Sequence, residues 1–416
     1  MSVQSTAGKT IAVSAWRTPL VIITCGCLIG AIGFGPRAAL GLFLTPMSSA
    51  YSWGRDVFAL ALAIQVLIWG AATPFAGAIA DRYGTVRVLS VGALLYCAGL
   101  VLMAQSTTPA MLNLSAGVLA GLGIAGTSFT LVLAAFSKLM PAEWRGFAFG
   151  VGTAAGSVGQ FLFSPLAVGF IDFLGWQHAL VTLGIITLLM IPCALGVRTP
   201  PMDVGVTPGG APKQSLVQAL SEAFGHRSYV LLVIGFFTCG FQLLFITVHL
   251  PSYLVDRGLS VDAGAWTIGV IGLFNILGSI GAGWLGDRMP KRYLLSVIYL
   301  LRSLAVAIFI SLPVTSVSAV VFGASMGLLW LSTVPPTSGL VALMFGTRWM
   351  ATLFGFAFFS HQVGGFLGVW LGGVLFERTG SYEVIWWLSI ALGVISAIIN
   401  LPIIEKPVLR AAPVPA

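Results

Sequence analysis

The stretch GAIADRYGTVR, residues 77–87, ends a long apolar segment with an aspartate, two arginines and two glycines. A related stretch, GWLGDRMPKR at residues 283–292, ends another apolar segment 206 residues later, counted from Gly77 to Gly283. That separation is close to half of the 416-residue chain, and both stretches contain the pattern Gly-x-x-x-Asp-Arg. A charged turn that recurs at half-length predicts two structurally similar halves. In a membrane chain, such repeats indicate an alternating-access carrier.

The composition places the chain in a membrane. Hydrophobic residues make up 58% and charged residues 8%, against about 25% charged in soluble domains, and the mean hydropathy is +1.01. A helix needs about 20 apolar residues to cross the hydrocarbon core. The predicted fold is all-α, with twelve transmembrane helices in two six-helix pseudo-repeats. The predicted helices are 19–46, 55–80, 86–105, 110–136, 146–170, 177–197, 229–252, 263–284, 293–312, 316–343, 349–375 and 381–403. The first is longer than the apolar core of a signal peptide, so we expect it to be retained.

The net charge of +8 reports topology rather than a nucleic-acid partner. Fifteen lysines and arginines fall in the termini and the even-numbered connections, and three fall in the odd-numbered ones. The positive-inside bias therefore places both termini and the 198–228 connection in the cytoplasm. The short loops favour a bacterial inner membrane, and a monomer is expected.

The domain organisation follows from this pattern. Residues 1–197 form the N-terminal six-helix bundle and 229–404 the C-terminal one. Residues 198–228 form a cytoplasmic linker, in which Ser215 and Gln218 predict a capping box at the start of a short amphipathic helix. Residues 405–416 are predicted to be a disordered tail. The five cysteines lack metal or disulfide spacing, so no metal and no cofactor are expected.

With these motifs in order, the chain resembles the major facilitator superfamily over nearly its whole length. Gly77, Asp81, Arg82 and Arg87 match the loop between helices 2 and 3 of that superfamily, which carries a basic pair where this chain has TV at 85–86. Residues 35–65, 144–167 and 175–184 are similar to bacterial members of the monocarboxylate transporter family. Animal members carry an aspartate and an arginine on helix 8, where this chain has Asn275 and Ser279.

The charged residues within the apolar segments suggest what is carried. None of the twelve aspartates and glutamates lies deep in such a segment, whereas Arg37 and Arg302 do. An arginine at mid-bilayer costs about 2.5–3.5 kcal/mol on insertion scales, so it normally faces a partner or a cavity. The missing counter-charge is best supplied by the substrate, because a guanidinium pairs with a carboxylate through two hydrogen bonds. A small organic anion is therefore the predicted substrate.

Each arginine has a structural alternative. Arg37 follows a Gly-Phe-Gly-Pro break in helix 1, and could instead bond backbone carbonyls that Pro36 frees. Helix 1 lines the central cavity in the superfamily, and helix 9, which carries Arg302, is peripheral. Arg302 is thus a candidate substrate ligand or a partner of the helix 8 or helix 10 backbone.

Further substrate-binding candidates are polar side chains within the helices. His361 could relay a proton, since histidine titrates near neutral pH, or could be a hydrogen-bonded structural residue. For the amides, bridging between helices is the alternative to substrate contact. The amide candidates are Gln160, Gln242, Asn275 and Gln362.

The charged turns predict gating contacts. By resemblance, Asp81 meets the N-terminus of helix 11 near Arg348, where a negative charge is favoured by the helix dipole. Arg82 and Arg87 would link neighbouring helices, and Gly77 belongs to the same motif. Anchoring at the lipid headgroups is the alternative for these charges. Asp287 and Arg288 are the gating candidates of the second half.

These features predict a secondary transporter for a small monocarboxylate, linked to protons, in contact with the lipid bilayer. Exchange of two anions such as dicarboxylates is an alternative, because it needs no titratable relay. An exporter of cationic drugs would use buried acids, and a neutral-solute carrier would not need deep arginines. The sequence contains no nucleophile–base constellation, so an enzyme is not expected.

Overall fold

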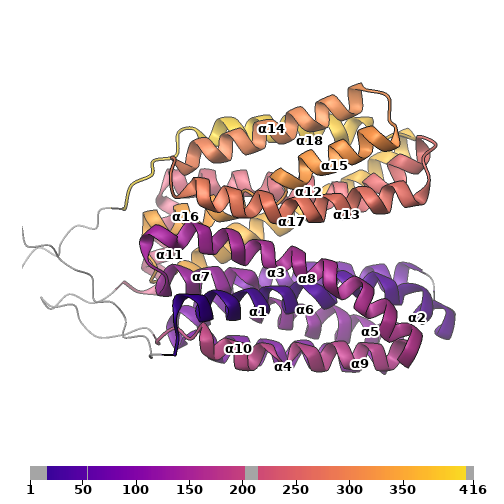
Figure 1. The fold of residues 1–416 in the computed structure, drawn as a ribbon, viewed down its shortest axis with the longest axis horizontal. Coiled ribbons are helices and arrows are strands. Elements are labelled where there is room, and N and C mark those ends of the chain that lie inside the picture. The colour runs from indigo at the N-terminus through magenta and orange to yellow at the C-terminus, as the bar shows by residue number, and fades with distance from the viewer. Residues whose placement is uncertain (1–15, 54, 202–213, 409–416) are drawn as a thin grey trace, which may run out of the picture.

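The computed structural model describes residues 16–53, 55–201 and 214–408. Within these ranges, twelve helical spans are long and apolar enough to cross a membrane, which confirms the predicted all-helical fold. The spans run side by side, and the linker and both ends of the described chain lie at one end of the bundle (Figure 1). We call this the termini end, and the other the opposite end. Residues 202–213 of the predicted linker and 409–416 of the predicted tail lie outside the described residues.

Each half has six spans. In the first half the helices are α1 (Pro19–Ala39), η1 (Leu40–Phe43), α2 (Leu44–Tyr51), α3 (Arg55–Tyr83), α4 (Thr85–Ala104), α5 (Pro109–Leu112), η2 (Asn113–Leu119), α6 (Ala120–Gly126), α7 (Phe129–Leu139), η3 (Ala142–Trp144), α8 (Arg145–Leu174), α9 (Trp176–Thr187) and α10 (Met190–Gly196). After α11 (Leu216–Gly225), the second half has α12 (Arg227–Asp256), α13 (Val261–Gly286), α14 (Lys291–Ser311), α15 (Ser316–Leu329), α16 (Val334–Phe345), α17 (Met350–Thr379) and α18 (Glu383–Asn400).

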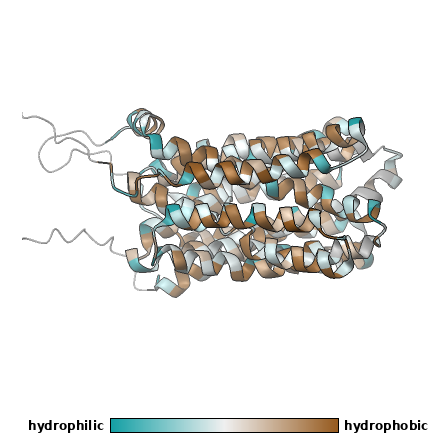
Figure 2. Ribbon diagram, turned by 90° about the horizontal axis from the view of Figure 1, so that it is seen from above, coloured by the Kyte–Doolittle hydropathy of each residue, from teal (hydrophilic) through white to brown (hydrophobic). Residues whose placement is uncertain are grey.

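The hydropathy of the surface fits a bilayer. Figure 2 shows apolar ribbon along the middle of the spans and hydrophilic positions gathered toward the two ends. On α13, the large side chains of Trp266, Leu273 and Leu277 are exposed and lie seven and four residues apart, so they form one stripe along the helix. Such a stripe would be unfavourable in water and suits lipid. The chain is an integral, multi-pass membrane protein.

The helix contacts repeat between the halves. The first span packs along the fifth in each half, as α1 against α8 and α12 against α17. The main contacts between halves are also equivalent, with α3 against α17 and α13 against α8. Glycines permit this closeness, since a Cβ on Gly159 would overlap the Ala31 carbonyl and one on Gly240 would overlap that of His361. The halves therefore meet along two symmetric seams.

Two spans are broken where the cavity lies. The fourth span is interrupted between α6 and α7, where Ser128 caps α7, and the tenth between α15 and α16. Pro335 and Pro336 begin α16, where a missing N–H costs little. In the linker, α11 begins with the predicted capping box between Ser215 and Gln218.

Candidate substrate cavity

A cavity of about 180 Å³ lies between the two halves. Its walls come from α1, α3, α7 and α8 of the first half and from α12, α13, α16, α17 and the α15–α16 break of the second. The lining residues are Phe34, Arg37, Trp69, Phe129, Thr153, Gly156, Ser157, Gln160, Phe236, Leu243, Leu244, Thr247, Ile268, Ile271, Gly272, Asn275, Trp330, Leu331, Val334, Phe358, His361 and Gln362. Five of the seven predicted substrate-binding residues are among them, and none of the lining residues is acidic.

Arg37 is the fixed charge of this cavity. It lies in the last turn of α1, directly after Pro36. Its guanidinium lies over the Trp69 ring, with Cζ 4.8 Å from the ring centroid. The Nε atom is buried and has no hydrogen-bond partner in the described structure. The cation is thus held by an aromatic face while part of its donor capacity remains unused.

Asn275 joins the two halves at the cavity wall. Its Nδ2 donates to Ser157 Oγ on α8 across a distance of 2.5 Å. Its Oδ1 accepts from the Leu331 N–H in the α15–α16 break, at 2.9 Å. This amide satisfies a backbone group freed by the break and also connects it to the first half. It is both a lining residue and a helix bridge.

His361 and Gln362 form a polar pair on α17. His361 Nδ1 is 3.1 Å from Gln362 Oε1, and Gln362 Nε2 is buried without a described partner. The imidazole stacks on Phe358, with centroids 5.5 Å apart and planes at 14°. The thiol of Cys239 on α12 accepts from Thr333 Oγ1 at 3.2 Å. No sequence pattern predicts this contact, because Cys239 resembles any small core residue.

Arg302 and Gln242 do not line the cavity. Arg302 is fully buried, and its Nε and Nη2 donate to the Leu329 carbonyl at 2.9 and 2.6 Å. Nη2 also donates to the Trp330 carbonyl. Gln242 Nε2 donates to the Ser389 carbonyl at 3.0 Å, which joins α12 to α18. In this conformation both side chains have the structural role that the sequence left as the alternative to substrate contact, and Arg302 stabilises the end of α15.

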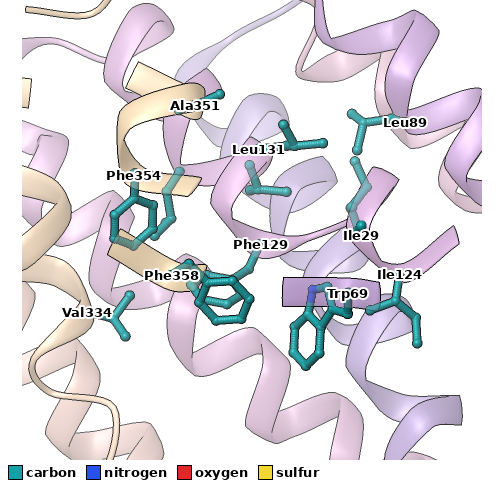
Figure 3. Close-up of a cluster of buried hydrophobic side chains, with 14 of the residues drawn as sticks. Ile29, Trp69, Leu89, Ile124, Phe129, Leu131, Val334, Ala351, Phe354 and Phe358 are labelled. Atoms are coloured by element: carbon teal, nitrogen blue, oxygen red, sulfur yellow. The ribbon is translucent and has the colours of Figure 1, made fainter. Parts of the chain in front are cut away.

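Four aromatic rings in contact with one another line the cavity. We call Phe34, Trp69, Phe129 and Phe358 the aromatic cluster; they come from α1, α3, α7 and α17. Phe129 lies 5.2 Å from Phe358 and Phe34 lies 5.7 Å from Trp69, between ring centroids. Figure 3 shows Phe129 and Phe358 together, with Trp69 beside them. The cluster therefore contains rings from both halves.

Asp81 and its repeat Asp287 lie at the termini end, and each accepts hydrogen bonds from the start of a helix in the other half. Asp81 Oδ2 accepts from the N–H and the hydroxyl of Thr352 in α17, both at 2.9 Å. Its Oδ1 forms a salt bridge of 2.7 Å with Lys138 of α7. Asp287 accepts from the N–H groups of Gly146 and Phe147 in α8, at 3.0 and 3.1 Å. We call these two sets of contacts the latches.

The other gating candidates lie around the latches. A Cβ on Gly77 would come within 2.5 Å of the Ala351 carbonyl oxygen, so glycine permits α3 to approach α17 there. Arg82 and Arg87 are exposed, and Arg288 lies over the Trp284 ring at 4.0 Å. The salt bridge to Asp81 comes from Lys138, which the sequence motif does not contain. Burial raises the pKa of the Asp287 carboxyl, although its two N–H donors and the nearby Lys291 and Arg288 oppose this.

The seams are tighter at the termini end than farther along the same helices. A Cβ on Gly283 would overlap the Gly146 carbonyl, whereas one on Gly272, three turns earlier on the same face, would meet no described atom of another element within 4 Å. On α17, a Cβ on Gly355 would meet Pro74 at 2.9 Å, whereas Gly373 has open space. The helices of the two halves are therefore packed more tightly at the termini end than beside Gly272, which lines the cavity, and Gly373.

Comparison with known proteins decides the family. A model of the Major Facilitator Superfamily matches residues 26–369, well over half of the chain. The chain belongs to the major facilitator superfamily. This facilitator is 26% identical to the uncharacterized MFS-type transporter YcxA of Bacillus subtilis over 400 residues, covering 90% of this chain and 93% of that protein.

Two further relatives extend the comparison. The facilitator is 26% identical to human monocarboxylate transporter 11 over 381 residues, covering 89% of this chain and 79% of that one. The crystal structure of the transporter FucP in its outward conformation has a TM-score of 0.68 at 17% identity, covering 92% of this chain and 99% of that one. The chain is thus a transporter of the facilitator fold, with monocarboxylate transporters among its relatives.

Proposed function

We propose that this facilitator carries a small monocarboxylate by alternating access. The observation that carries the proposal is the partly unpaired guanidinium of Arg37, which lies in a cavity whose described lining contains no acid. A carboxylate would supply the missing charge and accept the unused N–H groups. The names of the monocarboxylate transporters among the relatives support the same substrate class.

The latches and the looser packing beside Gly272 and Gly373 support a rocking movement of one half against the other. We place the termini end in the cytoplasm of a bacterial inner membrane, following the positive-inside bias. The conformation described here then opens outward, with both latches closed. Breaking the latches and closing the opposite end would expose the cavity to the cytoplasm.

Proton-linked symport is our proposal for coupling, with His361 or the carboxylic acid itself carrying the proton. Histidine ordinarily titrates near neutral pH, and His361 faces the same cavity as Arg37. Anion exchange is the second candidate, because the lining contains no aspartate or glutamate that could act as a relay. Uptake of radiolabelled acids into proteoliposomes with and without an inward pH gradient distinguishes them. Uptake that ignores the gradient would exclude symport.

Substitution of Arg37 tests the ligand assignment. Arg37→Gln should raise the KM for the transported acid by at least about tenfold, because a charge-assisted hydrogen bond contributes about 1.5–3 kcal/mol. Arg37→Lys should restore part of the affinity, since it keeps the charge without the planar pair of donors. Arg257→Gln is the matched control, because Arg257 is exposed and lies over the Tyr253 ring outside the cavity. Normal transport by Arg37→Gln would refute the assignment.

A further inference from the structure

The cavity pairs one positive charge with a broad aromatic surface. Arg37 is the permanently charged side chain among the described lining residues, and its guanidinium lies against Trp69 of the aromatic cluster. A carboxylate bound to Arg37 therefore has its substituent next to this cluster. Phe236 and Trp330 add further apolar wall on the side of the second half. The geometry favours an acid whose tail is apolar and flat.

The cavity has too few positive charges to bind a substrate with a second carboxylate. His361, the other ionisable group on the wall, is stacked on Phe358 and lies within hydrogen-bonding distance of Gln362. A second carboxylate would therefore lie against aromatic faces without a fixed positive partner. Burying an unpaired charge in such surroundings is strongly unfavourable. The cavity thus discriminates by charge number as well as by sign.

The volume of the cavity limits the size of the apolar part of the substrate. The cavity measures about 180 Å³, and an apolar cavity of about 150 Å³ accommodates benzene. A three-carbon acid would leave most of the aromatic cluster without contacts. A six-membered ring joined to a carboxylate by a short linker would fill the space, and its edge or face would pack against Phe129 and Phe358.

We propose that the preferred substrate is an aryl or arylalkyl monocarboxylate, in the size range of benzoate to phenylacetate. This inference rests on the proposed function, since it requires Arg37 to bind a carboxylate. It adds that the aromatic cluster determines specificity among carboxylates. The ring of the substrate would contact α3 and α7 of one half and α17 of the other, so binding would bridge the two halves.

Calorimetric titration of the purified full-length protein tests this with four probes: phenylacetate, propionate, succinate and phenylacetamide. Phenylacetate should bind at least about tenfold more tightly than propionate, because only it contacts the aromatic cluster. Phenylacetamide has the ring without the charge, and succinate has a second charge without the ring. Both should bind at least about tenfold more weakly than phenylacetate.

Two variants test whether phenylacetate binding depends on a flat aromatic face or only on general apolar packing. Phe358→Leu keeps an apolar side chain of somewhat smaller volume but removes the flat face, so it should weaken phenylacetate binding by roughly two- to tenfold and weaken propionate binding less. Phe173→Leu is the matched control, because Phe173 is 89% exposed at the end of α8. Thermal unfolding of each variant verifies that it is folded.

The outcomes distinguish this inference from the proposed function. If propionate binds as tightly as phenylacetate and both depend on Arg37, the aryl preference is overturned while carboxylate transport stands. If phenylacetamide binds as tightly as phenylacetate, the role of the carboxylate fails, and both proposals fall. Tighter binding of phenylacetate that is lost in Phe358→Leu and retained in Phe173→Leu supports the inference.

Discussion

Replacing Asp81 by Asn should release the termini end of the protein. Asp81 is 2% exposed and accepts three hydrogen bonds, two from Thr352 on α17 in the other half and one from Lys138 on α7 in its own half. An asparagine of the same shape keeps one acceptor oxygen for Thr352. Its NH₂ group would face the Lys138 ammonium, which would then be unpaired.

The size of the effect follows from these contacts. Removing one member of a buried ion pair costs about 3–5 kcal/mol when the other charge is left unpaired. Lys138 has a side-chain exposure of 12%, so water can relieve part of this cost. A net loss of about 2–4 kcal/mol from the latched state is expected, which changes the equilibrium between closed and open termini ends by about 30- to 700-fold.

Spin labels can measure this equilibrium. Tyr83 and Tyr293 are both 43% exposed at the termini end, one in each half, and the five native cysteines can be replaced. Electron–electron double resonance between labels at these positions should give one short distance for the parent and a dominant longer distance for Asp81→Asn. Turnover should fall more than substrate affinity.

Asp287→Asn is the matched comparison and should shift the distances less. In the described structure Asp287 accepts hydrogen bonds from two N–H groups and has no salt bridge within hydrogen-bonding distance. Unchanged distances in Asp81→Asn would refute the latch.

Three further predictions concern Gly373 near the opposite end, the pH dependence of the Asp287 latch, and Arg302 beside the interrupted tenth span. Gly373→Leu should leave substrate binding intact but slow counterflow at least about tenfold, because α17 must approach the first half there when the opposite end closes. The raised pKa of Asp287 means that its carboxyl binds a proton more tightly in the latched state than an exposed aspartate does. Lowering the pH from the raised pKa to the ordinary pKa of aspartate should therefore stabilise the latched state and favour the short label distance. Asp287→Asn should remove this pH dependence. Arg302→Lys should destabilise the protein by about 2 kcal/mol in thermal unfolding, because an ammonium cannot reproduce the forked bonds to Leu329 and Trp330.

The features that follow from local sequence were predicted well. Twelve spans and the start of α11 follow from hydropathy and capping, because lipid requires each span to satisfy its own backbone. The meeting of Asp81 with the first turn of α17 was expected from the motif, and the same contact occurs between Asp287 and α8. Arg37 was expected in the cavity because it follows the Pro36 break and because helix 1 lines the cavity in the superfamily that the chain resembles.

The features that depend on packing were not predictable. Arg302 and Arg37 are both deep arginines, and the sequence left substrate contact and the backbone of helix 8 or 10 as alternatives for Arg302; the structure identifies the carbonyls at the end of α15 as its partners. Lys138 is distant in sequence from Asp81, so the motif alone assigned the neighbouring arginines as links. The role of Asn275 depends on contacts in two other elements, which no single helix pattern encodes.

The shared aromatic cluster has a consequence for the energetics of a transport cycle. Trp69 and Phe129 belong to one half and Phe358 to the other. While the latches are closed, the ring centroid of Phe358 lies 5.0 Å from that of Trp69 and 5.2 Å from that of Phe129. When the termini end separates, this surface must divide, so a ligand that bridges it loses contacts on one side. The affinity for cargo is therefore expected to be unequal on the two faces of the membrane. Release would then be driven by the same movement that opens the exit, and the carrier would have a high-affinity loading face and a low-affinity unloading face.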